Sequence, residues 1–464
     1  MSSGFEEIVV IFCNLIVDNS RRKVYNRIIK MVIWRLLMNR DLFKYIEKSP
    51  TAYHACAESA SVLADNGYTE LYEGEAWDLC AGGKYFVRRN GSSLIAFRAP
   101  EKCENGFMIT ASHSDSPCLK IKDNSTLGDA NYTRLSVEVY GGPIYSTWLD
   151  RPLAVAGRVS VETEKGIDVR LVDTKEPCVV IPNVAIHMNR EINRGFNFNQ
   201  AVDLIPLFGE KEPEKSFSAM IAELAGAKEE DILASDLYVY NCQAGVEWGG
   251  FISSPRLDDL QCAYSALEAF VGAKESKATP VYALFDNEEV GSSTKQGAAS
   301  TFLYDVLERV ADSIGKGGEV YRRAVANSFM VSCDNAHAIH PNHPEYSDKN
   351  HTVKMNGGIV IKYNANQKYT TDGISSAIFK RICERAGVPY QLYCNRADMP
   401  GGSTLGSIAT TKVSVKTVDI GLAQLAMHSS FETAGAKDTE YMVKALKKFY
   451  ESSLTQNCSG FEIK

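Results

Sequence analysis

The sequence predicts an α/β protein whose sheet is mostly parallel and sandwiched between helices. Short, mainly apolar runs are typical of strands buried on both faces, and they occur at residues 107–112, 281–285 and 328–333. Amphipathic helical patterns separate and follow them, at residues 260–271 and 374–386 and from Asp438 onward. Strands that alternate with helices in this way favour a parallel sheet.

A different pattern occupies residues 126–236. Apolar and polar residues alternate there in strand-like segments between Gly and Pro turns, at residues 134–140, 154–161 and 168–172. We interpret this stretch as a β-rich domain inserted into the α/β domain. The catalytic fold is then discontinuous, with residues 38–125 as its first part and residues 237–464 as its second.

The first 37 residues differ from the rest of the chain. Their apolar run at residues 8–17 is too short to span a bilayer, and it follows Glu6 and Glu7 rather than a basic segment. We interpret residues 1–37 as an appended segment outside the core, with Met38 as a candidate start; an amphipathic interfacial anchor is the alternative. Without a convincing signal peptide, we expect a cytoplasmic protein with reduced cysteines.

Length, charge and cysteine spacing narrow the class of protein. The 464 residues are enough for two or three domains, and 50 Lys and Arg against 57 Asp and Glu leave a net charge of −7. This balance argues against a nucleic acid or an anionic membrane as partner. The 12 cysteines never approach Cys-x-x-Cys spacing, which excludes zinc fingers and thioredoxin-like redox sites.

Polar residues follow three of the predicted strands, at the sheet edge where α/β proteins bind their ligands. They are His113-Ser-Asp115, Asp286-Asn-Glu288-Glu289 and Asp334-Asn-Ala-His337. A histidine can bind a metal through one ring nitrogen while an acid two residues on holds the other. Adjacent carboxylates at a buried strand end repel each other, and a bound cation relieves that cost. One of the two glutamates can then be a ligand and the other a base.

Each motif taken alone also has a simpler interpretation. The acidic run at residues 286–289 can be a solvated loop, and Asp334 can form an Asx turn. Asp258 and Asp259 precede a predicted helix and can be its acidic first turn. His428 follows a predicted strand and can be a hydrogen-bonded core histidine.

Three other histidines could be mistaken for a metal cluster. They recur at a spacing of three, as His337, His340 and His343. Pro341 and Pro344 break any helix there, so the three rings need not converge. We interpret this segment as a loop beside the site.

Together the motifs resemble those of the aspartyl aminopeptidase family, metallopeptidase family 18. The matching segments run in the family's order over nearly all of residues 38–464: His113-Ser-Asp, Ile181-Pro-Asn-Val-Ala-Ile-His187, Arg256-Leu-Asp258-Asp, Asp286-Asn-Glu-Glu289-Val-Gly, Ser332-Cys-Asp334-Asn-Ala-His-Ala-Ile-His-Pro-Asn, Asp398-Met-Pro-Gly-Gly-Ser-Thr and Met427-His428-Ser. The resemblance implies the di-zinc exopeptidase fold and a zinc aminopeptidase that removes N-terminal residues from peptides, with a preference for Asp or Glu.

The resemblance also implies a ligand set for two zinc ions. Asp258 bridges them, and one ligand pair completes each site: His113 with Asp334, and Glu289 with His428. Cobalt and manganese are possible substitutes because they accept the same ligand types.

Several further roles follow from the resemblance. Glu288 is then the general base, and Asp115 orients the ring of His113. The inserted domain pairs subunits and brings His187 into the neighbouring active site, where it stabilises the developing oxyanion. Lys362 and Tyr369 bind the acidic side chain of the substrate. Dimers of the family assemble into a tetrahedral dodecamer.

Some positions depart from the family's pattern. Asp259 replaces an Asn, Asn335 replaces an apolar residue of eukaryotic members, and Ser430-Phe431 replaces a Cys/Ile-Arg pair. Because loop residues near a site can line its pocket, a broad or neutral-residue aminopeptidase is an alternative to acidic preference. Two further hypotheses are a non-enzymatic assembly or cargo protein on the same scaffold and a related di-zinc deacylase or carboxypeptidase.

Overall fold

A computed structural model describes residues 35–102, 105–315 and 317–464. Most of the predicted N-terminal segment, residues 1–37, lies outside the described residues. Residues 35–37 belong to a helix that continues to residue 47 and buries Leu42 in the core. The predicted boundary at residue 38 falls inside this helix.

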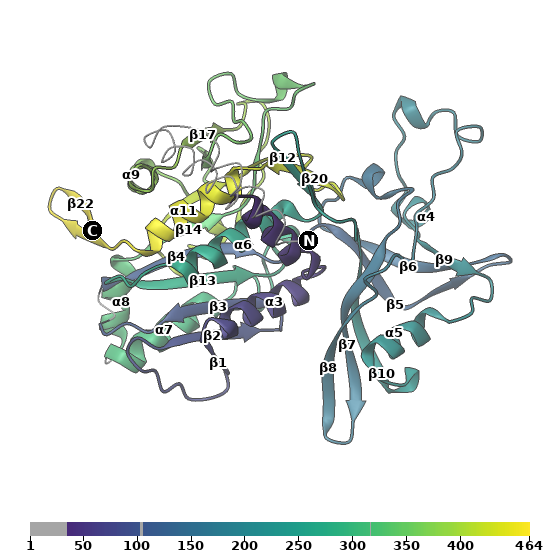
Figure 1. Cartoon of the computed structure of the whole chain (residues 1–464), viewed down its shortest axis with the longest axis horizontal. Helices are drawn as coiled ribbons and strands as arrows, with labels where there is room; N and C mark the ends of the chain where they lie inside the picture. Colours follow the sequence, from purple (N-terminus) through teal and green to yellow (C-terminus); the bar gives the residue numbers. More distant parts are fainter. Residues whose placement is uncertain (1–34, 103–104, 316) are drawn as a thin grey trace, which may run out of the picture.

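A nine-stranded sheet forms the centre of the part of the chain that the structure describes (Figure 1). In spatial order its strands are β1 (Thr69–Leu71), β2 (Lys84–Arg89), β3 (Ser93–Arg98), β13 (Thr279–Phe285), β4 (Phe107–His113), β14 (Phe329–Cys333), β18 (Lys416–Gly421), β16 (Ile359–Tyr363) and β17 (Tyr390–Cys394). The central strands β13, β4, β14 and β18 are parallel to one another. The predicted α/β fold is confirmed, and the three apolar runs form the strands β4, β13 and β14.

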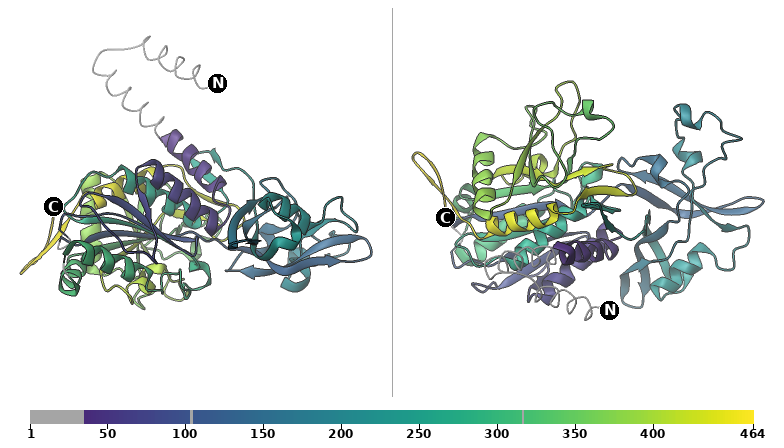
Figure 2. Two further views of the ribbon diagram at one scale, coloured as in Figure 1. Left: turned by 90° about the horizontal axis from the view of Figure 1, so that it is seen from below. Right: turned by 45° about the horizontal axis from the view of Figure 1, so that its top comes forward.

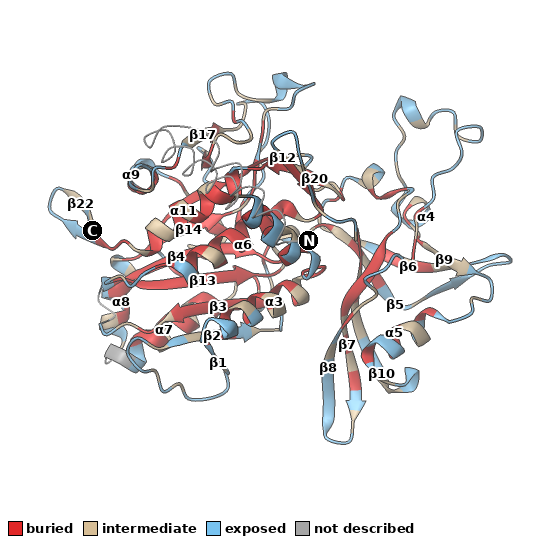
Figure 3. Cartoon of the chain, in the orientation of Figure 1, coloured by how far each residue is buried: buried red, intermediate tan, exposed pale blue. Residues whose placement is uncertain are grey.

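Helices cover both faces of this sheet. One face packs against α3 (Ala52–Asp65), α6 (Leu257–Gly272), α9 (Gly373–Ala386) and α11 (Asp438–Tyr450). The other packs against α7 (Phe302–Gly315), α8 (Gly318–Ala326) and α10 (Leu405–Ala409). Met108 and Ile109 are neighbours in β4 but belong to different cores, because successive side chains of a strand point to opposite faces. Figure 3 shows the resulting buried layers.

The inserted domain extends from one side of the α/β domain (Figure 2). Its antiparallel sheet has the order β8 (Gly166–Asp173), β7 (Ala154–Thr163), β10 (Ile232–Tyr240), β5 (Cys118–Gly128), β6 (Tyr132–Tyr140) and β9 (Leu207–Glu210). The helix α5 (Phe217–Ala225) packs on it, and a short α4 (Gln200–Asp203) lies beside β6. The sheet begins before residue 126 and ends after residue 236, because β5 and β10 extend past those predicted limits.

Shorter elements complete the described structure. A third sheet has the order β11 (Val246–Trp248), β12 (Phe251–Ser254), β20 (Glu432–Gly435), β19 (Ala423–Leu425) and β15 (Ala336–His337). The chain ends in a hairpin of β21 (Leu454–Asn457) and β22 (Gly460–Ile463). Short 3-10 helices lie at Tyr145–Trp148, Ile192–Arg194, Glu229–Asp231, Glu288–Val290 and Pro344–Tyr346. Among the described residues, no helix has the length and apolar character needed to cross a membrane.

Candidate metal centre

The predicted metal ligands lie together at the carboxyl edge of the central sheet. His113 ends β4, Asp334 follows β14, and Glu289 follows β13. Asp258 lies in the first turn of α6, and His428 lies in the loop between β19 and β20. Ligating atoms of these side chains fall within 4.8 Å of one another in overlapping groups that could hold metal ions. The topology therefore brings together His113 and His428, which are 315 positions apart in the sequence.

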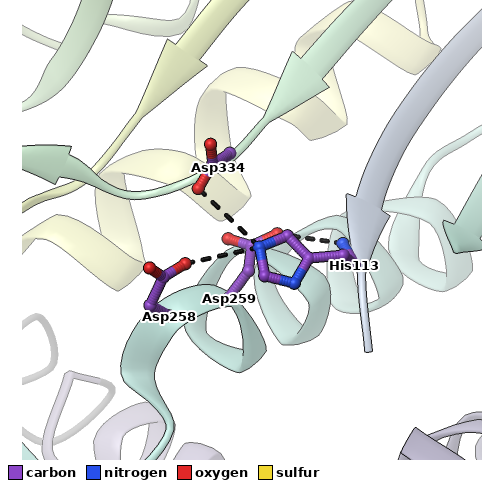
Figure 4. A group of neighbouring side chains, drawn as sticks. All are labelled: His113, Asp258, Asp259 and Asp334. Atoms are coloured by element: carbon purple, nitrogen blue, oxygen red, sulfur yellow. Dashed lines mark hydrogen bonds and ion pairs between the residues drawn. The ribbon is translucent and has the colours of Figure 1, made fainter. Parts of the chain in front are cut away.

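One group is built around His113 (Figure 4). Its Nε2 atom lies 3.4 Å from Oδ1 of Asp258 and 3.9 Å from Oδ1 of Asp334. Its Nδ1 atom lies 3.0 Å from the main-chain carbonyl oxygen of Asp115, and it donates to that acceptor. A proton on Nδ1 leaves the lone pair of Nε2 free for a cation. The main-chain carbonyl of Asp115 thus makes the shorter contact, because its carboxylate is 3.5 Å from Nδ1.

The other group is built around His428. Its Nε2 atom lies 3.3 Å from Oε2 of Glu289 and 3.6 Å from Oδ2 of Asp258. Its Nδ1 atom donates to the carbonyl oxygen of Gly142 at 3.0 Å, which again leaves Nε2 free. The backbone of His428 has a left-handed φ of 68°, which is costly for a residue with a side chain. Its N–H donates to Glu432 at 2.8 Å, and this bond helps to hold the loop in place.

The donor atoms fit zinc. Oδ1 of Asp258 and Oε1 of Glu289 are buried and accept no hydrogen bond, which is costly unless a cation faces them. Zinc with nitrogen and oxygen ligands at about 2.0–2.1 Å requires ligand atoms about 3.3 Å apart in a tetrahedron. The four contacts of the two histidines span 3.3 to 3.9 Å. The two oxygens of Asp258 face different histidines, as expected of a bridging ligand.

Without a cation, the two glutamates of the site hold protons more tightly than usual. Burial, with repulsion from Asp334 and Asp115, raises the pKa of Glu288 to about 8. Burial and Asp258 also raise the pKa of Glu289 well above its usual range. Burial alone would lower the pKa of His113, but the neighbouring carboxylates outweigh it and raise that pKa. Perturbed pKa values that cluster in this way are a common feature of functional sites.

Lys362 lies on β16 with a side chain that is 2% exposed. Its Nζ atom donates to the carbonyl oxygen of Asp334 at 2.9 Å, to Oδ2 of Asp334 at 3.3 Å and to the carbonyl oxygen of Asn335 at 3.2 Å. Burial raises the pKa of Asp334, but Lys362 and His113 outweigh it and hold that pKa below its usual value. The three protons of the ammonium group thus all have acceptors beside a predicted metal ligand.

A cavity of about 360 Å³ opens onto the metal centre. Its wall includes Lys362, Tyr369, Tyr393 and His337 together with the predicted ligands. Nζ of Lys362 lies 5.2 Å from the ring centroid of Tyr369. His337 packs against Tyr393 with ring centroids 6.3 Å apart. The structure therefore places both predicted substrate-binding residues at one cavity.

His187 does not join this group in its own chain. It is exposed in the loop between β8 and α4, and it does not line the cavity at the metal centre. Val184, Ile186 and Met188 in the same loop are 51%, 47% and 78% exposed. Large apolar side chains that are exposed together are typical of an interaction surface.

Sequence reasoning misses several residues that contact the site. The prolines around His337 predict only a loop beside the site, whereas the ring of His337 belongs to the cavity wall. Asp259 accepts a hydrogen bond from the N–H of His113 at 3.1 Å. Glu432 accepts from the N–H of Asp258 at 3.0 Å. The sequence offers one signal for His337, Asp259 and Glu432: each is an acidic or aromatic residue close in sequence to a predicted ligand.

The edge of the parallel sheet presents nitrogen and oxygen ligands, and a further glutamate, Glu288, lies beside them. This arrangement is typical of a metal-dependent hydrolase. The sequence model of the family described as "Aminopeptidase I zinc metalloprotease (M18)" matches residues 45–450. The chain belongs to this family, which confirms the resemblance noted from the sequence. It is therefore a metallo-aminopeptidase of a zinc-dependent hydrolase family.

Relatives match over most of the chain. A protein of Clostridium acetobutylicum named "Probable M18 family aminopeptidase 2" is 45% identical over 89% of this chain and 98% of its own length. A protein of the same name from Pseudomonas paraeruginosa is 40% identical over 90% of this chain and 99% of its own length.

Solved structures agree with the fold. Ape4 in a complex with Nbr1 has a TM-score of 0.88 and 35% identity, over 91% of this chain and 87% of that one. The S. cerevisiae mApe1 dodecamer has a TM-score of 0.80 and 29% identity, over 90% of this chain and 97% of that one.

Proposed function

We propose that the chain is a two-zinc aminopeptidase that removes N-terminal residues from peptides, with a preference for Asp or Glu. The observation that carries the two-ion assignment is Asp258, whose Oδ1 faces His113 and whose Oδ2 faces His428. His113 and Asp334 complete one site, and Glu289 and His428 complete the other. When bound, the ions would supply Lewis acidity at the scissile carbonyl and lower the pKa of a water molecule.

Glu288 is the proposed general base. It precedes the ligand Glu289, and its N–H donates to Oδ1 of Asp115 at 3.1 Å, which holds the start of this loop. A carboxylate in this position takes a proton from the attacking water and passes it to the leaving amine. In the absence of a cation, burial raises the pKa of this carboxyl group.

We expect restriction to N-terminal residues because of the free α-amine of the substrate. This amine can contact the metal centre and the carboxylates around it, which face the cavity. An internal peptide bond lacks this amine. We therefore expect no cleavage of peptides whose N-terminus is acetylated.

Acidic preference is the proposed role of Lys362 and Tyr369. A buried ammonium group in the cavity wall attracts a carboxylate more strongly than it would in bulk water. The net charge of −7 makes such a local cation necessary, because the overall field of the protein repels acidic peptides. One observation favours the neutral-residue alternative: all three protons of Lys362 already have acceptors.

A substrate panel separates these two functions. The zinc-reconstituted protein is assayed on p-nitroanilides of Asp, Glu, Leu and Met, with Lys362→Ala as the variant and Glu288→Gln as the inactive control. We expect acidic substrates to lead, and Lys362→Ala to lose them selectively. A wild-type protein that cleaves Leu tenfold faster than Asp would exclude acidic preference. Equal loss on all substrates would show that Lys362 acts through Asp334 instead.

We further propose that His187 acts in a second copy of the chain. Its exposure beside Val184, Ile186 and Met188 supports a subunit contact, as does the similarity to the mApe1 dodecamer. In a dimer it would reach the neighbouring cavity and help to stabilise the oxyanion, and dimers would build a dodecamer. Size-exclusion chromatography with light scattering checks this, because a stable active monomer would refute the role of His187.

A reducing compartment, the cytoplasm, is the proposed location. No disulfide joins the ten cysteines within the described ranges, and six of them lie outside the buried core, with Cys80 and Cys458 exposed. Free thiols at such positions persist where the surroundings keep them reduced.

A further inference from the structure

The inserted domain reaches the metal centre through the end of β6. The chain leaves the loop of His113 and Asp115, enters the inserted domain at Cys118, and returns in the next strand. The register pairs Cys118 with Tyr140, so the last residue of β6 lies beside the start of β5. Shifting this pairing by one residue would turn the side chain of Tyr140 to the other face of the sheet.

Tyr140 contacts two residues of the metal centre through one oxygen atom. Its hydroxyl donates to Oδ2 of Asp115 at 2.8 Å, and it accepts a hydrogen bond from Nδ2 of Asn287 at 2.8 Å. Burial and nearby carboxylates raise the pKa of Tyr140 far above its usual value, so the phenol keeps the proton that it donates. Its ring packs edge-on against Tyr238 with centroids 5.7 Å apart, which fixes the direction of the hydroxyl.

Asp115 connects Tyr140 to the loop of the two glutamates through hydrogen bonds. Its carboxylate also accepts from the N–H groups of Glu288 and Glu289, each at 3.1 Å. Asn287, the other partner of Tyr140, has a left-handed φ of 62° immediately before these two glutamates. The hydroxyl of Tyr140 therefore joins the loop that carries His113 to the loop that carries Glu288 and Glu289.

The two residues after Tyr140 contact the second half of the centre. The carbonyl oxygen of Gly142 accepts from Nδ1 of His428 at 3.0 Å. Gly141 has a φ of +70°, and a Cβ atom added there would lie 3.1 Å from Cβ of Glu289. Residues 141 and 142 thus lie against both residues that complete the second proposed zinc site, Glu289 and His428.

We propose that Tyr140 is a positioning residue for the metal centre, and that the segment 140–142 makes the inserted domain part of that centre. This inference rests on the two-zinc site proposed above, and it adds residues that hold the ligands without binding an ion. Residues that hold metal ligands through hydrogen bonds typically contribute a factor of about 10–100 to metal affinity. The inserted domain is then required for metal binding within a single chain, apart from any role in pairing subunits.

Zinc affinity of the full-length apoprotein tests this proposal. Affinity is measured by competition with a chromophoric chelator for wild type, Tyr140→Phe and the control Tyr238→Phe, which removes a hydroxyl from the adjacent ring. We expect Tyr140→Phe to bind zinc about 10–100-fold more weakly and the control to stay within about twofold of wild type. Wild-type affinity in Tyr140→Phe would overturn the proposal. A wild type that binds no zinc would instead refute the proposed function.

A double-mutant cycle asks whether Tyr140 acts through Asp115. If it does, Tyr140→Phe adds little to Asp115→Asn, because the acceptor of its hydrogen bond is already altered. Losses that multiply would overturn the route through Asp115 and leave the hydrogen bond with Asn287 as the contact between Tyr140 and the metal centre. The absorption spectrum of the cobalt-substituted protein should change in Tyr140→Phe and not in Tyr238→Phe, since it reports ligand geometry.

Two glycine variants keep the test independent of Tyr140, should Tyr140→Phe fail to fold. Gly141→Ala meets Glu289 and must adopt a positive φ, whereas a Cβ atom at Gly142 meets only Nδ1 of His428 at 3.6 Å, an ordinary contact. We expect Gly141→Ala to weaken zinc binding about tenfold more than Gly142→Ala does. Equal affinities in the two variants would count against the proposal, with melting of each apoprotein as the check on folding.

Discussion

The two halves of the metal centre are built differently. The side chain of His113 is 1% exposed, and that of His428 is 32% exposed. His113 and Asp334 are held by contacts within the α/β domain, including the buried Lys362. The ring of His428 is held by a carbonyl oxygen of the inserted domain and stands on a loop with a left-handed backbone. The ligands of the first half thus take their direct contacts from the α/β domain, whereas a ligand of the second half is held where two domains meet.

The largest effect on activity is expected for Glu288, which belongs to neither proposed ligand set. Glu288→Gln should lower kcat by a factor of about 10²–10⁴, because it removes the proposed base while keeping the size of the side chain. Metal content, measured by atomic absorption, should equal that of wild type. If Glu288→Gln also loses zinc, Glu288 is itself a zinc ligand, and one half of the metal centre has a ligand in addition to those proposed.

The next effect tests the comparison directly. His113→Ala removes a ligand from the first half and should weaken zinc binding at least about 100-fold, beyond the usual loss for an outer partner. His428→Ala removes a ligand from the half that lies nearer to solvent. It should leave one tightly bound ion per chain, because the half with His113 stays intact. Chelator titration of both variants gives stoichiometry and affinity. The reverse result, with a tight ion only in His113→Ala, would invert the comparison.

The smallest effect concerns the metal-free protein. In the folded metal-free protein, the pKa of Glu288 is raised from its usual 4.5 to about 8. Between these two pH values, the folded state therefore binds a proton that the unfolded state releases. The raised pKa of His113 acts in the same direction. The free energy of unfolding therefore falls as pH rises from about 5 to 8, by up to about 1.4 kcal/mol per pH unit for each proton.

Melting curves of the chelated and zinc-loaded proteins across this pH range check the effect. The melting temperature of the apoprotein should fall with pH, and the gap to the zinc-loaded protein should widen. Apo Glu288→Gln lacks one titrating group and should show a weaker dependence. An apoprotein that gains stability between pH 5 and 8 would contradict the charges described for the site.

Much of the fold can be predicted from local pattern. The strands β4, β13 and β14 are mainly apolar and buried over their whole length because both faces are covered, so the pattern alone indicates a central parallel sheet. The third sheet has no such signal. Its strands β15 and β19 have two and three residues, which is too short for a periodic pattern.

The sequence by itself determined the chemical inventory of this protein. Acids and histidines after predicted strands, in the order of a known family, predicted a set of metal ligands and a general base, since parallel strands bring their carboxyl ends to one edge. Only the tertiary structure decided which partners hold those ligands. The register of β5 and β6 places Tyr140 on Asp115, and the meeting of two domains places Gly142 on His428. Such contacts depend on pairing between distant segments, and residue type alone carries no information about that pairing.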